Sequence, residues 1–390
     1  MPVAETRLNR SLFYRVASFA LFFLVAAASL NGYYDKVGFA EYVKVTPAYD
    51  SPLTLHGKFA LESCIDGTAD RPFVFRRLIP AIANAVDEIV PAPFIDRLYN
   101  AKNSDGVYLH DKFSHSDVER DHRYFFRYWI VFILEVAAFF LTALMCDRFC
   151  RTAGFSRPSA LLSSMAFMLT IPYFMENGGY IYDCPEMLFF FLSALLAIRG
   201  RWLWLIPLSA VATMNKESYL FFLPCLYPFL RHHLQRNQVL ARLSVIAVPS
   251  VLVNLYVHLA YRMNPGGNAE LHIVEQIKDV RNLILMPHPH ITYGILQPRT
   301  ENVLSILFLL WAIRTAWSSI AKSYRQHFWI AFGINLPLFL FLGGVAEIRA
   351  LSMLYVSLVI LIATLFEQWL RATAVVQTSE RQETERCLVS

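Results

Sequence analysis

The chain has few charged residues, and it lacks the short motifs that mark many soluble enzymes. Asp, Glu, Lys and Arg make up 17% of its 390 residues, against roughly 25% in ordinary soluble domains. It has no P-loop, HExxH, GxSxG or strand-linked GxGxxG motif, which disfavours ATP-driven transport and soluble-enzyme chemistry of these types. Its six cysteines form neither a CxxC pair nor a Cys/His zinc spacing. Neither a redox dithiol nor a structural zinc site is therefore expected.

Apolar residues dominate instead, at 56% of the chain, and they are organised in runs. Many runs approach the roughly 20 residues that cross a bilayer. They predict an all-α polytopic membrane protein with about ten transmembrane helices, near 12–30, 124–146, 157–175, 183–199, 202–214, 218–230, 239–261, 302–320, 327–343 and 350–370. The runs 202–214 and 218–230 are short, reaching only about 20 Å as helices, so a re-entrant hairpin is the alternative there.

The basic residues predict the orientation of these helices. The net charge is +5, from 35 basic and 30 acidic residues, but Lys and Arg are scattered through short loops, which argues against a nucleic-acid partner. They concentrate in alternate connections, so the positive-inside rule places both termini in the cytoplasm and the long segments 32–122 and 262–300 outside. We expect one polytopic domain over residues 1–372 and a disordered polar tail over 373–390.

Part of the first outer segment has the pattern of a helix that lies in the membrane interface. Between residues 76 and 90, Leu78, Ile82, Ala85 and Ile89 fall on one stripe, with polar residues elsewhere. This spacing predicts an amphipathic helix with that stripe turned to the apolar side.

Charged and polar side chains gather on the predicted outer side, where several helix ends meet. They are Asp35, Asp66, Asp70, Arg71, Arg76, Arg77, Glu176, Asn177, Tyr180, Tyr182, Asp183, Glu186, Asn215, Lys216, Glu217, Glu347 and Arg349. A cleft that holds carboxylates and cations together suits a reaction on an anionic amphiphile.

Several of these residues have two interpretations each. Asp183 precedes a phenylalanine-rich helix with Pro185 in its first turn, so it is either a helix cap or a site carboxylate. Lys216 and Glu217 form either an ion pair at a solvated turn or part of a site, where the lysine would bind a lipid-linked phosphate. The arginines that compete for this phosphate-binding role are Arg71, Arg76, Arg77 and Arg349; Arg76 and Arg77 can instead contact lipid phosphates.

Glu135 and the pair His288 and His290 are two further features with a bearing on function. Glu135 falls in the middle of a predicted span, where an ionisable group is costly and usually faces a partner or a cavity. It indicates either a proton-coupled transporter or a protonated carboxyl bonded to a neighbouring helix. His288 and His290 have no acidic or cysteine ligand at close spacing, so no metal site is expected there.

The layout resembles the GT-C superfamily of integral-membrane glycosyltransferases. The resemblance lies in helix one running into a long outer loop, Tyr33-Tyr34-Asp35, the segment Arg71-Pro-Phe-Val-Phe-Arg76-Arg77-Leu-Ile-Pro80, Tyr182-Asp183-Cys-Pro-Glu186 and Asn215-Lys216-Glu217. It implies transfer of a sugar from a polyprenyl-phosphate carrier to an envelope glycan or lipid acceptor at the outer face of a bacterial inner membrane. Asp35 is the favoured catalytic base, then Asp183, then Asp66, although the acidic pair that this family often carries in its first outer loop is missing beside Asp35.

The resemblance also implies how the reaction would proceed. One carboxylate takes the proton of an acceptor hydroxyl as its oxygen attacks the anomeric carbon, while Lys216, Arg76, Arg77 and Arg349 neutralise the departing phosphate. Glu217 and Tyr182 would complete the substrate site. No nucleotide cofactor is required, and a divalent cation is compatible with the scheme. The alternatives are a polysaccharide polymerase or other envelope-glycan enzyme, and a transporter or flippase that depends on Glu135.

Overall fold

The computed structural model describes residues 16–30, 61–102, 121–175, 180–267, 271, 273–274, 289–293, 295–298, 303–343 and 347–389. These segments are almost entirely helical. Within them, the strands are confined to a short antiparallel hairpin of β1 (Pro289–Thr292) and β2 (Ile295–Pro298). The expected helical architecture is confirmed apart from this hairpin.

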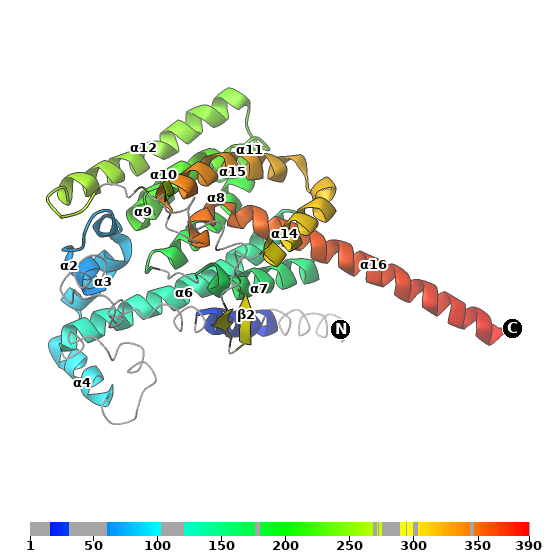
Figure 1. Ribbon diagram of the computed structural model, residues 1–390, viewed down its shortest axis with the longest axis horizontal. Helices are drawn as coiled ribbons and strands as arrows, with labels where there is room; N and C mark the ends of the chain where they lie inside the picture. The colour runs from blue at the N-terminus through cyan, green and yellow to red at the C-terminus, as the bar shows by residue number, and fades with distance from the viewer. Residues whose placement is uncertain are drawn as a thin grey trace, which may run out of the picture.

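A bundle of long helices forms the body of the protein (Figure 1). Its principal helices are α6 (His122–Thr152), α7 (Arg157–Phe174), α8 (Asp183–Ile198), α9 (Leu205–Asn215), α12 (Arg236–Ala260), α14 (Val303–Ala316), α15 (Lys322–Leu342) and α16 (Tyr355–Val389). Shorter helices are α2 (Leu61–Asp66), α3 (Leu78–Ile89), α4 (Ala92–Lys102), α10 (Ser218–Phe222) and α11 (Tyr227–Leu230). The 3-10 segments are η1 (Phe73–Phe75), η3 (Trp202–Trp204), η4 (Leu223–Leu226), η5 (Trp317–Ser319) and η6 (Ile348–Leu354), the last of which is kinked at Leu351. Helix α8 packs between α6 and α9, α12 covers α9, and α16 packs on α7.

Local sequence explains where several helices begin and break. The Asp121 side chain accepts a hydrogen bond from the Arg123 backbone N–H and so caps α6, and the Ser156 side chain caps α7 in the same way. The apolar run 218–230 does not form one helix, because Pro224 and Pro228 divide it into α10, η4 and α11.

Among the residues that the structure describes, three helices are long and apolar enough to cross a membrane: His122–Thr152, Arg236–Ala260 and Ile348–Ala374. The pair Leu78–Ile89 and Ala92–Asn100 would add a fourth if counted as one span, although it bends by 106°. Shorter apolar helical stretches, some made of two or three consecutive elements, are Val16–Leu30, Trp202–Asn215, Ser218–Leu230 and Val303–Ser319. The structure is consistent with a helical membrane protein, but the expected ten spans are not confirmed.

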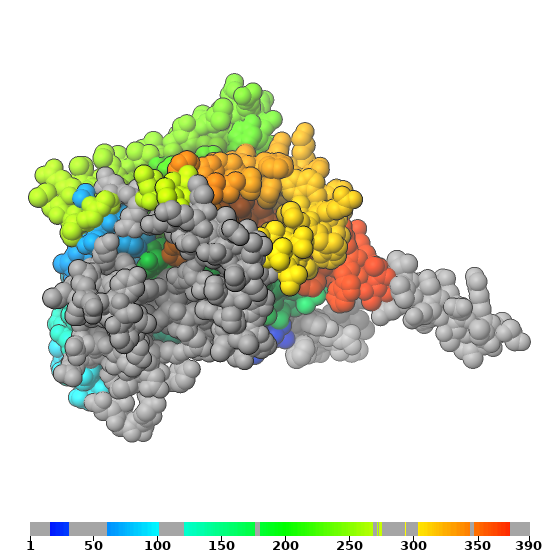
Figure 2. Space-filling model, in the orientation of Figure 1, coloured from blue at the N-terminus to red at the C-terminus, as the bar shows by residue number. Residues whose placement is uncertain are grey.

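Helices α12 and α14 lie at the surface of the bundle (Figure 2), and their exposed faces carry large apolar side chains. Leu252, Leu255, Tyr256 and Leu259 on α12 are each more than half exposed, as is Phe308 on α14. A soluble monomer rarely exposes so much contiguous apolar surface, whereas lipid chains would cover it without cost. This pattern agrees with membrane insertion of the bundle.

Helix α3 forms as predicted, and it packs on the bundle with a different stripe. Ile79, Ala83 and Asp87 face the interior, whereas Ala85 and Ile89 are exposed. Asp87 decides this orientation, because Arg127 of α6 donates two hydrogen bonds to its carboxylate, from Nε at 3.0 Å and from Nη2 at 2.8 Å. The amphipathic pattern therefore predicted the helix, and the bundle leaves the Ala85 and Ile89 part of the predicted stripe exposed, as an interfacial helix requires.

The C-terminal residues also differ from the expectation. We predicted a disordered tail over 373–390, whereas α16 continues as a helix to Val389 and projects from the bundle (Figure 1). The segment contains no proline or glycine, and Gln, Glu and Arg, which are good helix formers, make up seven of its 18 residues.

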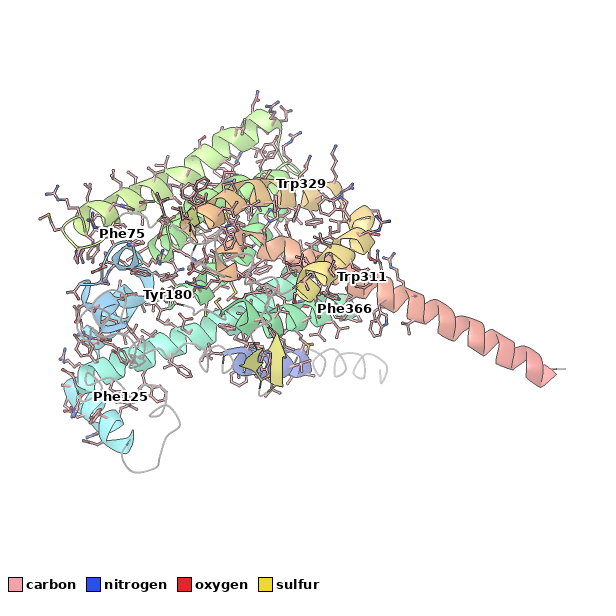
Figure 3. The ribbon with its side chains drawn as sticks, in the orientation of Figure 1. Phe75, Phe125, Tyr180, Trp311, Trp329 and Phe366 are labelled. Atoms are coloured by element: carbon pink, nitrogen blue, oxygen red, sulfur yellow. The ribbon has the colours of Figure 1, made fainter. Side chains whose placement is uncertain are left out.

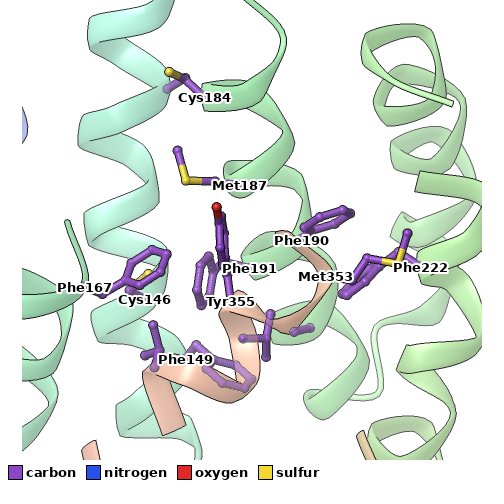
Figure 4. Packing of buried hydrophobic residues seen from close by; sticks show 14 of the residues in the cluster. Cys146, Phe149, Phe167, Cys184, Met187, Phe190, Phe191, Phe222, Met353 and Tyr355 are labelled. Atoms are coloured by element: carbon purple, nitrogen blue, oxygen red, sulfur yellow. The ribbon is translucent and has the colours of Figure 1, made fainter. Parts of the chain in front are cut away.

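Aromatic packing fixes the position of α8 inside the bundle (Figure 4). Phe191 of α8 contacts Phe149 of α6 and Phe167 of α7, with ring centroids 6.3 and 5.4 Å apart. Phe167 in turn packs on Tyr355 at 5.5 Å. These rings hold the middle of α8 against the rest of the bundle, and so position the helix whose first turn carries Asp183 and Glu186.

Candidate functional site

Charged side chains from four separate segments meet in one cluster at the N-terminal end of α8. We call this set the ion cluster; its members are Arg76, Tyr182, Asp183, Glu186, Lys216, Glu217, Glu347 and Arg349. They come from the residues before α3, from the start of α8, from the α9–α10 turn and from the start of η6. Six of the ten site residues predicted from the sequence are thus brought together.

Asp183 is the most strongly bound carboxylate of the ion cluster, with 3% of its side chain exposed. It accepts hydrogen bonds from Arg349 Nη1 at 2.6 Å, from Lys216 Nζ at 3.1 Å and from the backbone N–H of Tyr180 at 2.8 Å. It does not cap α8, since the N-cap position belongs to Tyr182. The capping interpretation is therefore wrong, and Asp183 is instead the anion between two cations.

Lys216 joins Asp183 to a second buried carboxylate. Its Nζ lies 2.8 Å from Glu186 Oε2, and the Ser218 hydroxyl donates to Glu186 Oε1 at 2.5 Å. Lys216 and Glu217 are therefore not a simple ion pair at a solvated turn, because the lysine turns inward to α8 and the glutamate pairs elsewhere.

Arg76 binds Glu217 on the neighbouring side of the cluster. Its Nη2 donates to Glu217 Oε1 at 3.0 Å, and a second nitrogen donates to the Tyr182 hydroxyl. Burial alone would raise the pKa of Glu217, but the positive charge of Arg76 and its hydrogen bonds lower that pKa below the ordinary value. Burial raises the pKa of the Tyr182 hydroxyl well above its usual range, so the tyrosine remains protonated.

Two stacked tyrosines cover the cations of the cluster. The rings of Tyr180 and Tyr182 are parallel to within 17°, with centroids 5.1 Å apart. Arg349 lies 4.4 Å from the Tyr180 centroid and Arg76 lies 4.1 Å from that of Tyr182, at distances typical of cation–π contacts. Figure 3 shows Tyr180 on the side of the bundle that faces α2 and α3.

The cluster carries more negative than positive charge. Its cations are Arg76, Lys216 and Arg349, and its carboxylates are Asp183, Glu186, Glu217 and Glu347. Each cation contacts at least one carboxylate, so an incoming phosphate would have to replace a carboxylate at the same nitrogen atoms. Such exchange is favourable where the anion offers several strong acceptor oxygens.

Asn335 and Asn215 hold the backbone around the ion cluster. Asn335 of α15 donates to the Ala350 carbonyl at 2.7 Å and accepts from the Met353 N–H at 3.1 Å, which fixes the turn that carries Arg349. Asn215 donates to the Tyr182 carbonyl at 2.8 Å, while its own side-chain oxygen is buried without a hydrogen-bond partner. That oxygen is an acceptor available to a ligand hydroxyl or a water molecule.

Two predicted arginines lie outside the cluster. Arg71 donates from its backbone to Pro265 at 2.8 Å and from its side chain to Gly266 at 2.5 Å, which joins this segment to the end of α12. Arg77 donates from its side chain to the carbonyls of Cys64 and Ile65. Neither contacts a member of the ion cluster through these bonds, so their assignment to the substrate site remains a prediction.

The two other predicted catalytic carboxylates are not placed in the ion cluster. Asp66 accepts a hydrogen bond from the Tyr124 hydroxyl and lies 3.6 Å from Arg127, at the contact of α2 with α6. This second group also contains Asp87, whose side chain is almost completely buried. Asp35 lies outside the residues that the structure describes.

Glu186 and Glu347 are the charged members of the cluster that our predicted site omitted. Glu186 follows Asp183 by three residues and therefore shares its helix face. That spacing, with Lys216 as a candidate cation, is the signal that would have included it. Glu347 pairs with Arg349, and only the turn of η6 brings that pair to α8.

Within the described part of the chain, no group of three or more His, Cys, Asp or Glu side chains is arranged to hold a metal ion. The cluster is built instead from carboxylates already bound to cations. Searches against family models, curated proteins and solved structures found no match for the chain.

Proposed function

We propose that this protein is a membrane glycosyltransferase that moves a sugar from a polyprenyl-phosphate donor to an envelope glycan or lipid acceptor. The ion cluster is the single observation that carries the proposal. Burying seven charged groups costs several kcal/mol for each ion unless they are paired, so their concentration at one end of an apolar bundle favours a functional role.

The chemistry of the cluster fits a donor with an anionic head and an apolar tail. Arg76, Lys216 and Arg349 would bind the phosphate as it departs, because charge-assisted hydrogen bonds are strongest in a partly dry site. The ring faces of Tyr180 and Tyr182 hold Arg349 and Arg76 in place beside the donor head. The prenyl chain would lie against the apolar bundle.

In this proposal Asp183 orients the cations rather than accepting the proton of the acceptor hydroxyl. Its three hydrogen bonds from Arg349, Lys216 and Tyr180 stabilise the anion, which makes it a weak base. Asp35 therefore remains our first candidate for the general base.

The test is mass spectrometry of surface glycans and polyprenyl-linked sugars in cells that express the wild-type chain or a variant. Asp183→Asn and Lys216→Met should remove one sugar from the glycan while its lipid-linked donor accumulates. Glu88→Gln, at an exposed position on α3, is the matched control and should leave the glycan unchanged. Shortened chains with unchanged donor would indicate a polymerase instead.

A proton-coupled transporter or flippase is the second candidate function, and Glu135 favours it. This carboxyl is fully buried within α6, and neither of its oxygens has a hydrogen-bond partner in the described residues. Transport would be favoured over sugar transfer by two results together. Glu135→Gln should lose transport activity while Lys216→Met retains it, and the glycan composition should be unchanged in both variants.

A further inference from the structure

Glu135 differs from the other buried carboxylates of the described bundle. Asp87, Asp183 and Glu186 each contact an arginine or lysine within 3.2 Å. Glu135 has 0% exposure and contacts no cation, and both of its oxygens are among the buried polar atoms without a hydrogen-bond partner. Stabilisation of the ion cluster therefore does not explain why a carboxyl is present at this position.

The neighbours of Glu135 lie in the first turn of α8. The Cys184 thiol lies near this carboxyl as a weak donor, without the geometry of an ordinary hydrogen bond, and the negative charge of Asp183 also acts on it. Helices α3, α4, α7 and α16 also pack on α6, but none of their described ionisable groups interacts with this carboxyl. Glu135 thus lies close to the first turn of α8, which carries Asp183 and Cys184.

Two opposing effects act on the proton of Glu135. Burial in an apolar interior strongly disfavours an isolated carboxylate, and the negative charge of Asp183 acts in the same direction. The N-terminal amides of α8 present partial positive charge, and they favour the anion. The balance is therefore sensitive to any change of charge at the ion cluster.

We propose that Glu135 is a reversible proton-binding site inside the bundle, and that its occupancy is coupled to the ion cluster through the first turn of α8. The step forms one O–H bond with a proton from water and needs no other reactant. Coupling of this kind is reciprocal: opening the ion cluster changes proton affinity at Glu135, and protonation changes how tightly the cluster holds an anion. This inference does not depend on sugar transfer.

The experiment is infrared difference spectroscopy of the full chain in lipid as pH is varied. The wild-type protein should show the C=O stretch of a protonated carboxyl at neutral pH, and Glu135→Gln should lack it. Glu88→Gln should retain it, because that exposed carboxyl is ionised. The band should disappear reversibly as the pH is raised.

Two further variants test the coupling, with shifts of opposite sign. Lys216→Met makes the surroundings of Glu135 more negative. The pH at which the band disappears should therefore rise by about one unit, which is a tenfold increase in proton affinity. Asp183→Asn should move it to lower pH. Circular dichroism and size-exclusion chromatography establish that each variant is folded.

Three results would overturn the proposal. The first is a wild-type spectrum identical to that of Glu135→Gln. The second is a band that persists unchanged to the pH of unfolding, since such a carboxyl does not exchange its proton. The third is a titration that neither charge variant moves. Because none of these readouts involves a sugar, failure here is distinct from failure of the proposed transferase activity.

Discussion

Replacing Lys216 by methionine removes the cation that joins Asp183 to Glu186. The methionine retains most of the volume and apolar length of lysine, so the change acts mainly on charge. Glu186 would keep only the hydrogen bond from Ser218, at 2.5 Å. Asp183 would keep Arg349, at 2.6 Å, and a backbone donor.

Removing one partner of a buried ion pair typically costs about 3–5 kcal/mol. Asp183 remains paired in the variant, and 13% of the Lys216 side chain is exposed. We therefore expect the lower end of that range, about 3 kcal/mol of unfolding free energy. The greater part should come from Glu186, whose side chain is 3% exposed and loses its single cation.

The assay is reversible unfolding in mixed micelles of a mild detergent and sodium dodecyl sulfate, followed by circular dichroism. Glu186→Gln, added to Lys216→Met, should recover at least about 1 kcal/mol, because the unpaired buried charge is removed. The exposed Glu88→Gln variant is the control, with an expected effect within about 0.5 kcal/mol. A Lys216→Met protein as stable as the control would refute the inference that the cluster is a buried ion network.

Three other changes test separate parts of the structure by the same unfolding assay. Gly266→Ala should cost about 2 kcal/mol or more, because φ is +88° and a Cβ would lie 2.5 Å from the Arg71 carbonyl oxygen; an unchanged stability would contradict that close approach. Asp87→Asn should cost about 2–3 kcal/mol, since it leaves Arg127 without its buried anion, whereas a neutral result would show that α3 is held by apolar contacts alone. For Glu217, the folded pKa is lowered, so its stabilising contribution is complete above its unfolded pKa and is lost as the pH falls below about 4.5. The free-energy difference between wild type and Glu217→Gln should therefore shrink on acidification, and a difference that grows would refute the assignment.

The helical class and most helices followed from the sequence, because apolar runs and capping residues act locally. The apolar run 157–175 predicted α7, and the Ser156 cap at its start in the structure needs no distant partner. Local pattern did not show which face of α3 meets the bundle. That face depends on a long-range contact, because Arg127, on another helix, draws Asp87 inward.

For the candidate site too, the sequence predicted part of the arrangement and packing decided the rest. The sequence placed Asp183, Lys216 and Arg349 on one predicted side of a membrane, since orientation depends on counting charges in loops. It could not decide which carboxylate each cation meets, because Lys216 lies more than thirty residues from Asp183 and pairing depends on how α8 packs beside the α9–α10 turn.

The sequence alone therefore determined what depends on composition. It showed that the chain is apolar and helical, that it suits a membrane, and that its few charges are concentrated near a few helix ends. Tertiary structure alone decided that six predicted site residues meet in one ion cluster, that Asp66 joins Arg127 instead, and that Glu135 is buried without a cation. The physical reason is that the apolar or polar character of a segment can be read from its own residues. The pairing of charges depends instead on distances between side chains of different helices, which only packing sets.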